Sequence, residues 1–412
     1  MTSPFPDDVV SHRLVALDVF RGLTFAGMML VNNAGDWKHF YAPLSHAAWH
    51  GWTFADFVFP FFLWIVGLSM TLSFSRRRQR GDAVAAMGGH VLRRAAVLFG
   101  LGLFLSGFPF GLAFEHVFSL ATIRIPGVLQ RIALCYLFVG IVVLYTRVRT
   151  QWILAGLLLF VYWWLLTFVS VPGYGAGVLT PEGNLARYVD SMLLAGHTWS
   201  HAPAPGFDPE GLLSTLPAMA TTLFGVLTGH FLNAGWSSRA RLLGLMGAGI
   251  FFTGLGLFID PWFPINKSLW TSSYVFFMAG MALVVFAVCH WLVDIQGWRR
   301  WFRPWVIYGT HTLSLYFLSG LTSKLIHTIK IVDANQPPVS LKVFYYRRLF
   351  LPFFDPWMAS FLHAMAFVCV MYLIAWLMYR WRRGFSGILR VRGGVSRPAT
   401  CATPTCWEKS TP

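Results

Sequence analysis

Long apolar stretches recur along the chain and are separated by short polar segments. A helix that spans a membrane needs about 20 mainly apolar residues, and most of these stretches approach that length. We therefore expect an all-α polytopic membrane protein with about ten transmembrane helices. The third, fourth and ninth are short or interrupted by polar residues, so nine or eleven are alternatives. The predicted helices cover residues 14–34, 53–74, 91–108, 127–145, 151–171, 211–233, 241–259, 270–292, 303–320 and 358–379.

Arginine placement predicts the orientation of these helices. Arg76, Arg77 and Arg78 follow the second predicted helix, and Arg299 and Arg300 precede the ninth. Connections on the cytoplasmic side of membrane proteins carry an excess of Lys and Arg. The pattern therefore places both the N- and the C-terminus in the cytoplasm.

The longer polar connections are predicted to lie on the non-cytoplasmic side of the membrane. Residues 35–52 carry several histidines, and residues 172–210 are rich in Gly and Pro, with a short helix expected near 184–195. The positively charged segment 321–357 is expected to contain a short re-entrant or amphipathic helix. Because the inner connections are short, we expect an acceptor molecule to arrive on the outer face.

The amino-acid composition indicates a protein embedded in a lipid bilayer. Hydrophobic residues make up 56% and charged residues 12% of the 412 positions. A soluble protein has roughly twice that charge density, so soluble, disordered and disulfide-rich classes are excluded. The net charge of +16 is read as an orientation signal, and no nucleic-acid partner is predicted. We expect a multi-pass protein of the cell inner (cytoplasmic) membrane whose surroundings are the lipid bilayer.

Three parts are predicted along the chain. Residues 1–12 form an N-terminal cytoplasmic segment, whose acidic residues argue against a cleavable signal peptide. Residues 13–383 form the transmembrane domain, and residues 384–412 form a disordered cytoplasmic tail. No repeat relates the two halves, which weakens a transporter built from inverted repeats.

Charged residues inside the predicted spans are functional candidates because they are costly there. Asp18 and Arg21 are three residues apart and share a helix face, so they form either a buried ion pair or a site for an anionic ligand such as a pyrophosphate. Asn32 lies near the same face at the outer end of this helix.

His46 and Asp56 are the candidates for acid–base chemistry. An imidazole acts as a general base or an acyl acceptor near neutral pH, although an ordinary loop histidine is the alternative. Asp56 near the start of the second span needs a partner and could orient a histidine or hold a sugar hydroxyl. His50 has metal-ligand spacing from His46, but a third ligand motif is missing and no metal is predicted.

Further polar groups lie at the outer ends of later helices. Arg124, Gln130 and Arg131 could contact a polar ligand or pair with buried acids. Asp208 and Glu210 flank a proline and could serve only to start a helix.

Asn266, Lys267 and Trp270 precede the eighth span, where Lys267 and Trp270 could line a sugar site or anchor the membrane interface. Motifs of soluble hydrolases and nucleotidyl enzymes (GxSxG, Walker, GxGxxG and HExxH) are absent from the sequence.

Several of these blocks together resemble the catalytic domain of the heparan-alpha-glucosaminide N-acetyltransferase family. The chain is most similar to its prokaryotic, NagX-like members, and order and spacing agree over about residues 12–383. The matching blocks are LDVFRGLT (17–24), VNN (31–33), HAAWHGWTFADFVFP (46–60), RIPGVLQR (124–131), DPEG (208–211) and NKSLW (266–270).

The resemblance implies transfer of an acetyl group from cytoplasmic acetyl-CoA to the amine of a terminal glucosamine on the other side of the membrane. His46 matches the family's active-site histidine and Asn32 its asparagine, while Asp18 and Asp56 match its intramembrane acids. His311 stands where the family has an asparagine. The resemblance and the residue chemistry together give a catalytic set of His46, Asn32 and Asp56, a donor set of Arg21 and Asp18, and acceptor contacts from Arg124, Gln130, Arg131, Asp208, Glu210, Asn266, Lys267 and Trp270.

Two other functions stay open at this point. One is a permease for N-acetylglucosamine or chitooligosaccharides, and the other is an O- or N-acyltransferase acting on another envelope glycan. The expected partner is an amino sugar or a glycan terminus, and a homodimer is considered. Acetyl-CoA is the expected co-substrate.

Overall fold

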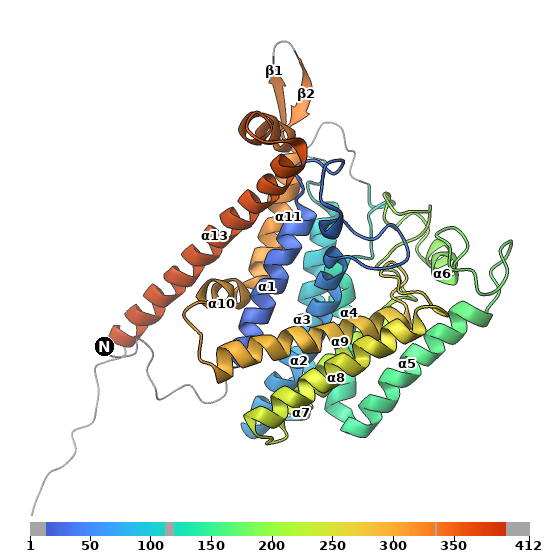
Figure 1. Cartoon of the computed structure of the whole chain (residues 1–412), viewed down its shortest axis with the longest axis vertical. Helices are drawn as coiled ribbons and strands as arrows, with labels where there is room; N and C mark the ends of the chain where they lie inside the picture. Colours follow the sequence, from blue (N-terminus) through green and yellow to red (C-terminus); the bar gives the residue numbers. More distant parts are fainter. Residues whose placement is uncertain (1–13, 112–118, 334–335, 393–412) are drawn as a thin grey trace, which may run out of the picture.

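A computed structural model describes residues 14–111, 119–333 and 336–392 (Figure 1). The helices are α1 (Val15–Asn32), α2 (Val58–Gln79), α3 (Val84–Gly107), α4 (Val128–Tyr145), α5 (Val148–Phe168), α6 (Leu185–Leu193), α7 (Thr215–Asn233), α8 (Ser238–Ile259), α9 (Ser272–His290), α10 (Arg303–Thr310), α11 (Thr312–Thr328), α12 (Leu341–Tyr345) and α13 (Pro356–Arg392). Short 3-10 or π turns are η2 (Ala42–Leu44), η3 (Phe54–Phe57), η4 (Trp291–Ile295) and η5 (Tyr346–Phe350), and the strands are β1 (Lys330–Asp333) and β2 (Gln336–Ser340), which form an antiparallel hairpin.

The all-α polytopic architecture is confirmed, with one difference in the spans. Nine helices among the described residues are long and apolar enough to cross a membrane. The ninth predicted span, 303–320, is divided into α10 and α11 at His311. Thr310 Oγ1 donates to the Ile307 carbonyl and Thr312 Oγ1 to the Gly309 carbonyl, and such local bonds compete with a continuous helix.

The connections alternate between two ends of the bundle as the sequence predicts. The arginine-rich connections α2–α3, α4–α5, α7–α8 and α9–α10 lie at one end, and the segments before α2, α7 and α13 lie at the other (Figure 1). α1 begins and α13 ends at the arginine-rich end. The assignment of that end to the cytoplasm stays a prediction.

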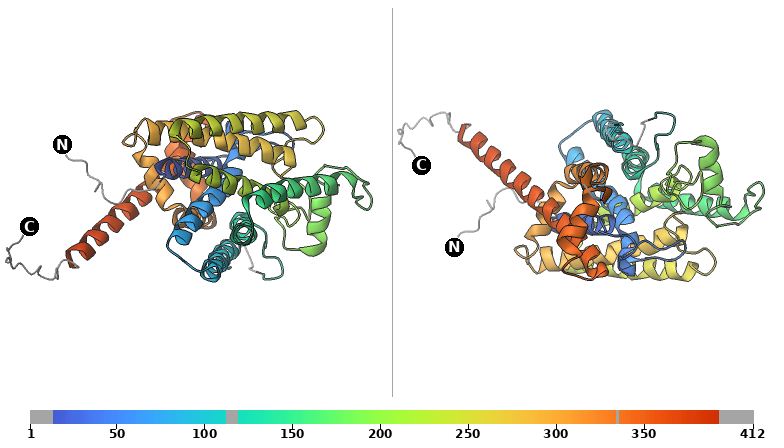
Figure 2. Two further views of the ribbon diagram at one scale, coloured as in Figure 1. Left: turned by 90° about the horizontal axis from the view of Figure 1, so that it is seen from below. Right: turned by 90° about the horizontal axis from the view of Figure 1, so that it is seen from above.

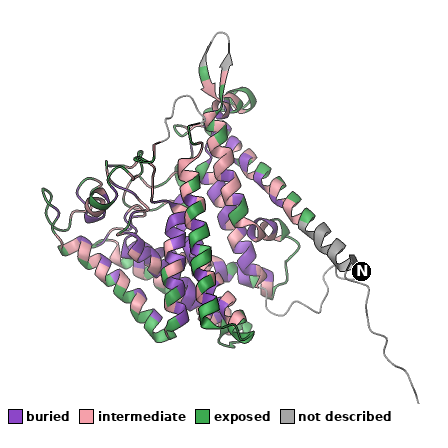
Figure 3. Ribbon diagram, turned by 180° about the vertical axis from the view of Figure 1, so that it is seen from behind, coloured by how far each residue is buried: buried purple, intermediate pink, exposed green. Residues whose placement is uncertain are grey.

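The core lies where small residues let helices approach closely. A Cβ on Gly22 of α1 would sit 1.9 Å from the Trp305 carbonyl oxygen of α10, and one on Gly67 of α2 would sit 1.9 Å from the Thr222 carbonyl oxygen of α7. Small residues serve this purpose in membrane helix pairs. α1, α2 and α7 are accordingly buried along most of their length, whereas α3, α5, α8 and α13 carry many exposed apolar residues. Figure 3 colours the ribbon by burial and shows exposed residues along the outer helices.

One peripheral segment differs in detail from expectation. α13 leans away from the bundle and continues to Arg392, past the boundary predicted at 383 (Figure 2). Its sequence has no proline between Pro356 and Pro398, and paired glycines follow only at 393–394. The remaining tail and residues 1–13 lie outside the described residues.

The helix expected near 184–195 is α6. Segment 321–357 contains the end of α11, the hairpin, α12 and η5.

Candidate functional site

His46 and Asp56 form a hydrogen-bonded pair at the outer end of α2. His46 follows η2, and Asp56 lies in η3, directly before α2. Asp56 Oδ1 is 2.8 Å from His46 Nδ1, while Oδ2 accepts from the backbone N–H of Ala47 at 3.1 Å and that of Thr53 at 2.9 Å. Thr53 and Asp56 cap this turn reciprocally, so the same bonds start the helix and fix the carboxylate.

The pair has the geometry of an oriented base. The carboxylate of Asp56 is 1% exposed, and the imidazole of His46 is 46% exposed. A carboxylate that accepts from Nδ1–H leaves the lone pair on Nε2 available to take a proton. The Tyr274 hydroxyl donates to the Asp56 carbonyl at 2.6 Å, which ties this turn to α9.

A cavity of about 490 Å³ opens beside His46. Asn32, the exposed last residue of α1, lines the same cavity. The other polar side chains on its wall include Asp56, Arg124, Trp199, His201, Glu210, Lys267, Ser268 and Tyr316, and buried apolar residues on its wall include Met28, Val31, Val58 and Phe62.

Lys267 reaches the pair from the loop between α8 and α9. Its Nζ lies 2.9 Å from His46 Nδ1, 3.2 Å from Nε2 and 3.4 Å from Asp56 Oδ1. Burial lowers the pKa of Lys267, and the nearby Asp56 and Glu210 charges oppose that shift. Lys267 therefore belongs to the site through its contacts with the His46–Asp56 pair.

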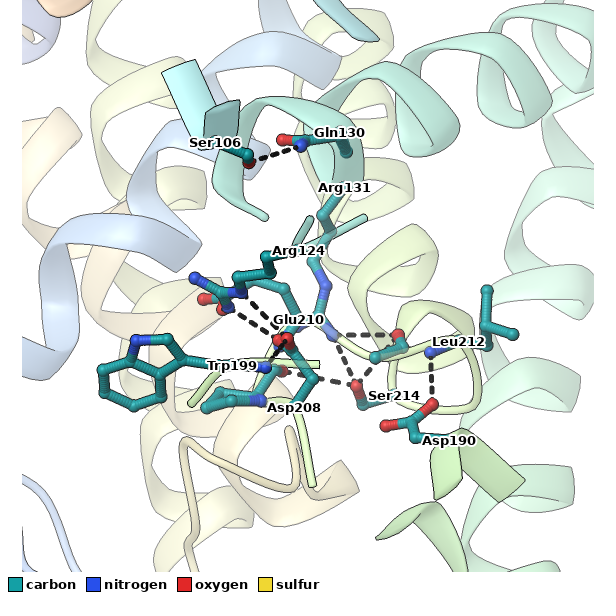
Figure 4. Close-up of polar contacts among 12 residues, drawn as sticks. Ser106, Arg124, Gln130, Arg131, Asp190, Trp199, Asp208, Glu210, Leu212 and Ser214 are labelled. Carbon is teal, nitrogen blue, oxygen red and sulfur yellow. Dashed lines mark hydrogen bonds and ion pairs between the residues drawn. The ribbon is translucent and has the colours of Figure 1, made fainter. Parts of the chain in front are cut away.

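A second charged group faces the pair across the cavity. Arg124 binds Asp208 in a bidentate manner, with Nε 2.8 Å from Oδ2 and Nη2 2.6 Å from Oδ1, and Nη2 also meets Glu210 Oε2 at 2.5 Å (Figure 4). Burial opposes protonation, but the two carboxylates raise the pKa of Arg124, so it stays charged. Trp199 lies against this guanidinium, with its ring centre 5.5 Å away, and its backbone N–H donates to Asp208.

Arg131 is buried behind this group rather than on the cavity. Its Nη2 donates to the Gly211 carbonyl at 3.2 Å and to the Ser214 hydroxyl, which fixes the start of α7 (Figure 4). Its guanidinium lies 5.1 Å from the ring centre of Trp270, whose Nε1 donates to Thr221. Arg131 and Trp270 thus support the site from within the bundle.

A second cavity of about 630 Å³ adjoins the first. Gln130 lines this cavity, with its Nε2 3.3 Å from the Ser106 hydroxyl. Residues on the walls of both cavities are Arg124, Val128, Trp199, His201 and Tyr316. The remaining polar wall includes Ser119, Thr122, Thr198, Ser200 and Lys324.

Asn266 holds the loop that carries Lys267. It is fully buried, and its Oδ1 accepts from the Leu269 backbone N–H at 2.8 Å. Its Nδ2 lies 3.4 Å from His50 Nδ1, so His50 faces this loop. Among the three residues predicted near the eighth span, only Lys267 lines the cavity.

Asp18 and Arg21 lie toward the opposite, arginine-rich end of α1. Arg21 Nη1 is 3.0 Å from Asp18 Oδ1 and 3.3 Å from the Gly309 carbonyl, and Nη2 is 2.8 Å from the Ser69 hydroxyl. The pair therefore links α1 to α2 and α10. Neither residue lines the cavity that holds His46.

Sequence reasoning missed Trp199, His201 and Tyr316, which supply large polar or aromatic side chains to the cavity wall. Trp199 and His201 lie in the long connection before α7, and Tyr316 lies on α11. Irregular loops carry no periodic signal, so their side chains are placed only by the fold. Within the described ranges, no group of three or more His, Cys, Asp or Glu side chains is arranged to hold a metal ion.

Comparison with known proteins gives consistent matches. A family profile described as "Heparan-alpha-glucosaminide N-acetyltransferase, catalytic" matches residues 13–256. The chain is 28% identical to heparan-alpha-glucosaminide N-acetyltransferase of Mus musculus, with 81% of this chain and 55% of that protein covered. The protein of the same name from Homo sapiens is also 28% identical, with 80% and 54% covered. The chain spans about half the length of these curated relatives.

Proposed function

The chain belongs to the heparan-alpha-glucosaminide N-acetyltransferase catalytic family, and on this basis we propose that it is an acetyl-CoA-dependent transmembrane N-acetyltransferase. The acceptor is the amine of a glucosamine-type sugar or glycan terminus outside the cytoplasm. One observation carries the proposal: the His46–Asp56 pair opens into a cavity that Asn32 also lines.

The chemistry follows from these three side chains. An acceptor amine must lose a proton to attack a thioester carbonyl, and Nε2 of His46 is placed to take it. The new N–C bond forms as the C–S bond breaks, and the imidazolium returns its proton to the leaving thiolate. His46 could instead carry the acetyl group first; both routes use the same nitrogen. The Asn32 amide donates a hydrogen bond to the carbonyl oxygen as negative charge develops there.

The donor is proposed to approach from the arginine-rich end of the bundle. The side chains of Met28, Val31, Val58 and Phe62 form an apolar part of the cavity wall that fits an acyl thioester arm. The positive charge of the arginine-rich connections would attract the anionic nucleotide part of acetyl-CoA. Arg21 and Asp18 stay candidate donor contacts, with a clear structural role in joining α1 to α2 and α10.

We propose that the acceptor binds at the end of the bundle opposite the arginine-rich connections. Arg124, Glu210 and Lys267 line the cavity and offer charged and hydrogen-bonding groups, and Trp199 offers a ring for a sugar face. Asp208 is buried off the cavity and would act by holding Arg124. Gln130 would contact the part of a glycan that enters the second cavity. Arg131, Asn266 and Trp270 would support these residues from behind.

We place the protein in the cell inner membrane with both termini cytoplasmic and residues 13–383 as the acyltransferase domain. A homodimer is compatible with the broad apolar periphery.

Purified protein in detergent tests the activity directly. Incubation with acetyl-CoA and glucosamine should yield N-acetylglucosamine and free CoA thiol in equal amounts, and His46→Ala should abolish both. His39→Ala is the matched control, because His39 is also paired with an aspartate, at 2.7 Å from Asp36, but lies off the cavity. Activity that survives in His46→Ala would refute the role given to His46. If the wild-type protein is inactive with glucosamine but acylates another glycan, the proposed acceptor is wrong.

A further inference from the structure

The segment before α13 presents apolar and cationic side chains on the surface of the protein. α12 and η5 are followed by a short turn that leads to Pro356, the first residue of α13. Apolar or aromatic side chains recur at every fourth position of this segment and are exposed: Tyr345, Leu349, Phe353 and Trp357. Arg347 and Arg348 lie in the same stretch and are also exposed. These six residues are called the outer patch below.

The other face of the segment holds the outer patch firmly on the bundle. Tyr346 is buried, and a Cβ on Gly35 would lie 2.7 Å from its ring. The Tyr346 hydroxyl donates to the Pro356 carbonyl at 3.2 Å. Ser360 Oγ donates to the Asp36 carbonyl at 2.9 Å and accepts from the Asp36 backbone N–H at 3.0 Å. The exposed side chains are therefore displayed on a fixed frame.

Arg347 and Arg348 are the charged members of the outer patch. Within the part of the chain that the structure describes, neither guanidinium makes a hydrogen bond or an ion pair. The two neighbouring acids have other partners: Asp355 accepts from a backbone N–H in the first turn of α13 at 3.0 Å, and Asp36 binds His39 Nδ1 at 2.7 Å. The outer patch therefore carries two positive charges that no acidic side chain of the described residues pairs.

The position of the outer patch along the chain places it at a membrane surface. The part of α13 that is long and apolar enough to span a membrane is Pro356–Trp381, which begins directly after this segment. The segment lies at the end of the bundle opposite the arginine-rich connections (Figure 1). Aromatic residues gather where a span meets the lipid headgroups, and arginine side chains extend their charged ends toward those headgroups. The excess of arginine expected on the cytoplasmic side leaves Arg347 and Arg348 at this end unexplained.

We propose that the outer patch binds an anionic phospholipid of the non-cytoplasmic leaflet. Leu349, Phe353 and Trp357 lie among the acyl chains in this arrangement, and the two arginines bind the lipid phosphate. Guanidinium groups match phosphate oxygens in geometry as well as in charge. A zwitterionic headgroup brings its own cation to the phosphate, so the unpaired arginines favour a headgroup with net negative charge.

The bound lipid would hold the outer end of α13 at the membrane surface. Through Ser360 and Asp36, this end contacts the loop that leads from α1 to His46. The inference concerns a lipid site and does not depend on the acetyl transfer proposed above.

Photo-crosslinking in vesicles tests this site directly. The protein is placed in phosphatidylcholine vesicles that contain a small fraction of phosphatidylglycerol with a diazirine in its acyl chains, and crosslinks are mapped by mass spectrometry. We expect crosslinks within residues 341–358, and excess unlabelled phosphatidylglycerol should suppress them far more than excess phosphatidylcholine. Arg347→Gln combined with Arg348→Gln should lower their yield about tenfold, because two charges that attract the headgroup are lost.

The matched control is Arg299→Gln combined with Arg300→Gln, a second pair of consecutive exposed arginines in the arginine-rich connection between α9 and α10. This control should leave the crosslinks within 341–358 unchanged. Equal suppression by the two lipids, or an undiminished yield in a folded protein that lacks Arg347 and Arg348, would overturn the proposal. If that variant does not fold, the competition between the two lipids on the wild-type protein decides alone.

Two further results would also overturn the proposal by identifying another occupant. Displacement of the lipid by glycerol 3-phosphate would assign the arginines to a soluble phosphate compound. Crosslinks between two copies of this chain at residues 341–358, in place of crosslinks to lipid, would assign the outer patch to a protein interface.

Discussion

At the residue scale, one carboxylate serves two purposes in the site. Asp56 Oδ2 closes the helix cap with Thr53, and Oδ1 holds the imidazole of His46. The sequence predicted that Asp56 needs a partner, because an unpaired carboxylate is costly near the start of a membrane span. The contact with Lys267, 221 positions from His46, was not predicted, because no local pattern links the two segments; the sequence indicated only a sugar contact or an anchor at the membrane interface for this lysine.

Removing the proposed donor to the carbonyl oxygen tests the part assigned to Asn32. Asn32→Ala should lower kcat about 100-fold, with KM changed much less, because the hydrogen bond is strongest as charge develops. Steady-state kinetics with acetyl-CoA and glucosamine measure this. The control Asn233→Ala removes an exposed amide that bonds Ser75 elsewhere and should retain activity. A kcat within threefold of wild type in Asn32→Ala would remove Asn32 from the mechanism.

The buried carboxyl of Asp190 predicts how stability depends on pH. Burial raises its pKa to about 7, and Asp208 adds to the shift. The folded state then holds this proton up to about pH 7, whereas the unfolded chain releases it near pH 4, so its contribution to stability falls as pH rises through that interval.

Asp190→Asn imitates the protonated acid and should flatten this dependence. Thermal unfolding in detergent at pH 5 and pH 8 should show a smaller loss in the variant than in wild type. At pH 8 the variant should melt higher by about 2–4 °C. A variant that melts lower than wild type at pH 8 would contradict the raised pKa.

At the scale of elements, hydropathy predicted the spans well, while helix breaks needed three-dimensional information. The third and fourth spans are confirmed as α3 and α4 although they looked short. The division at His311 depends on threonine hydroxyls that bond to nearby carbonyls, and the sequence shows only a polar interruption. The same break brings Gly309 of α10 against the backbone of Asp18, where a Cβ would lie 1.9 Å from a carbonyl oxygen.

Close packing of α1 on α10 gives a prediction for this element. Gly22→Ala should prevent the approach of the two helices, because the new Cβ would meet the Trp305 backbone, and it should cost about 3 kcal/mol or more. Gly27→Ala on the same helix is the control, since its nearest neighbour is the Phe54 ring at 3.7 Å. Size-exclusion profiles and melting in detergent measure both variants. Equal stability of the two variants would contradict this packing.

At the scale of the whole molecule, the alternation of arginine-rich and polar connections predicted which connections lie together at each end of the bundle. Polar side chains from segments 32–56, 124–131, 199–210 and 266–268 converge at one end. Sequence patterns predicted most of these residues singly. Packing between distant helices decides which of these residues reach the cavity. Lys267 and Glu210 line its wall, whereas Arg131 and Asn266 are buried behind it.

Transfer across the membrane is the central claim, and sided vesicles test it most directly. Protein of known orientation would be placed in proteoliposomes with acetyl-labelled acetyl-CoA on the side of the arginine-rich connections and glucosamine on the other. We predict labelled N-acetylglucosamine on the glucosamine side, its loss in His46→Ala and its retention in His39→Ala. Uptake of N-acetylglucosamine without any transfer of label would contradict the account and identify a permease instead.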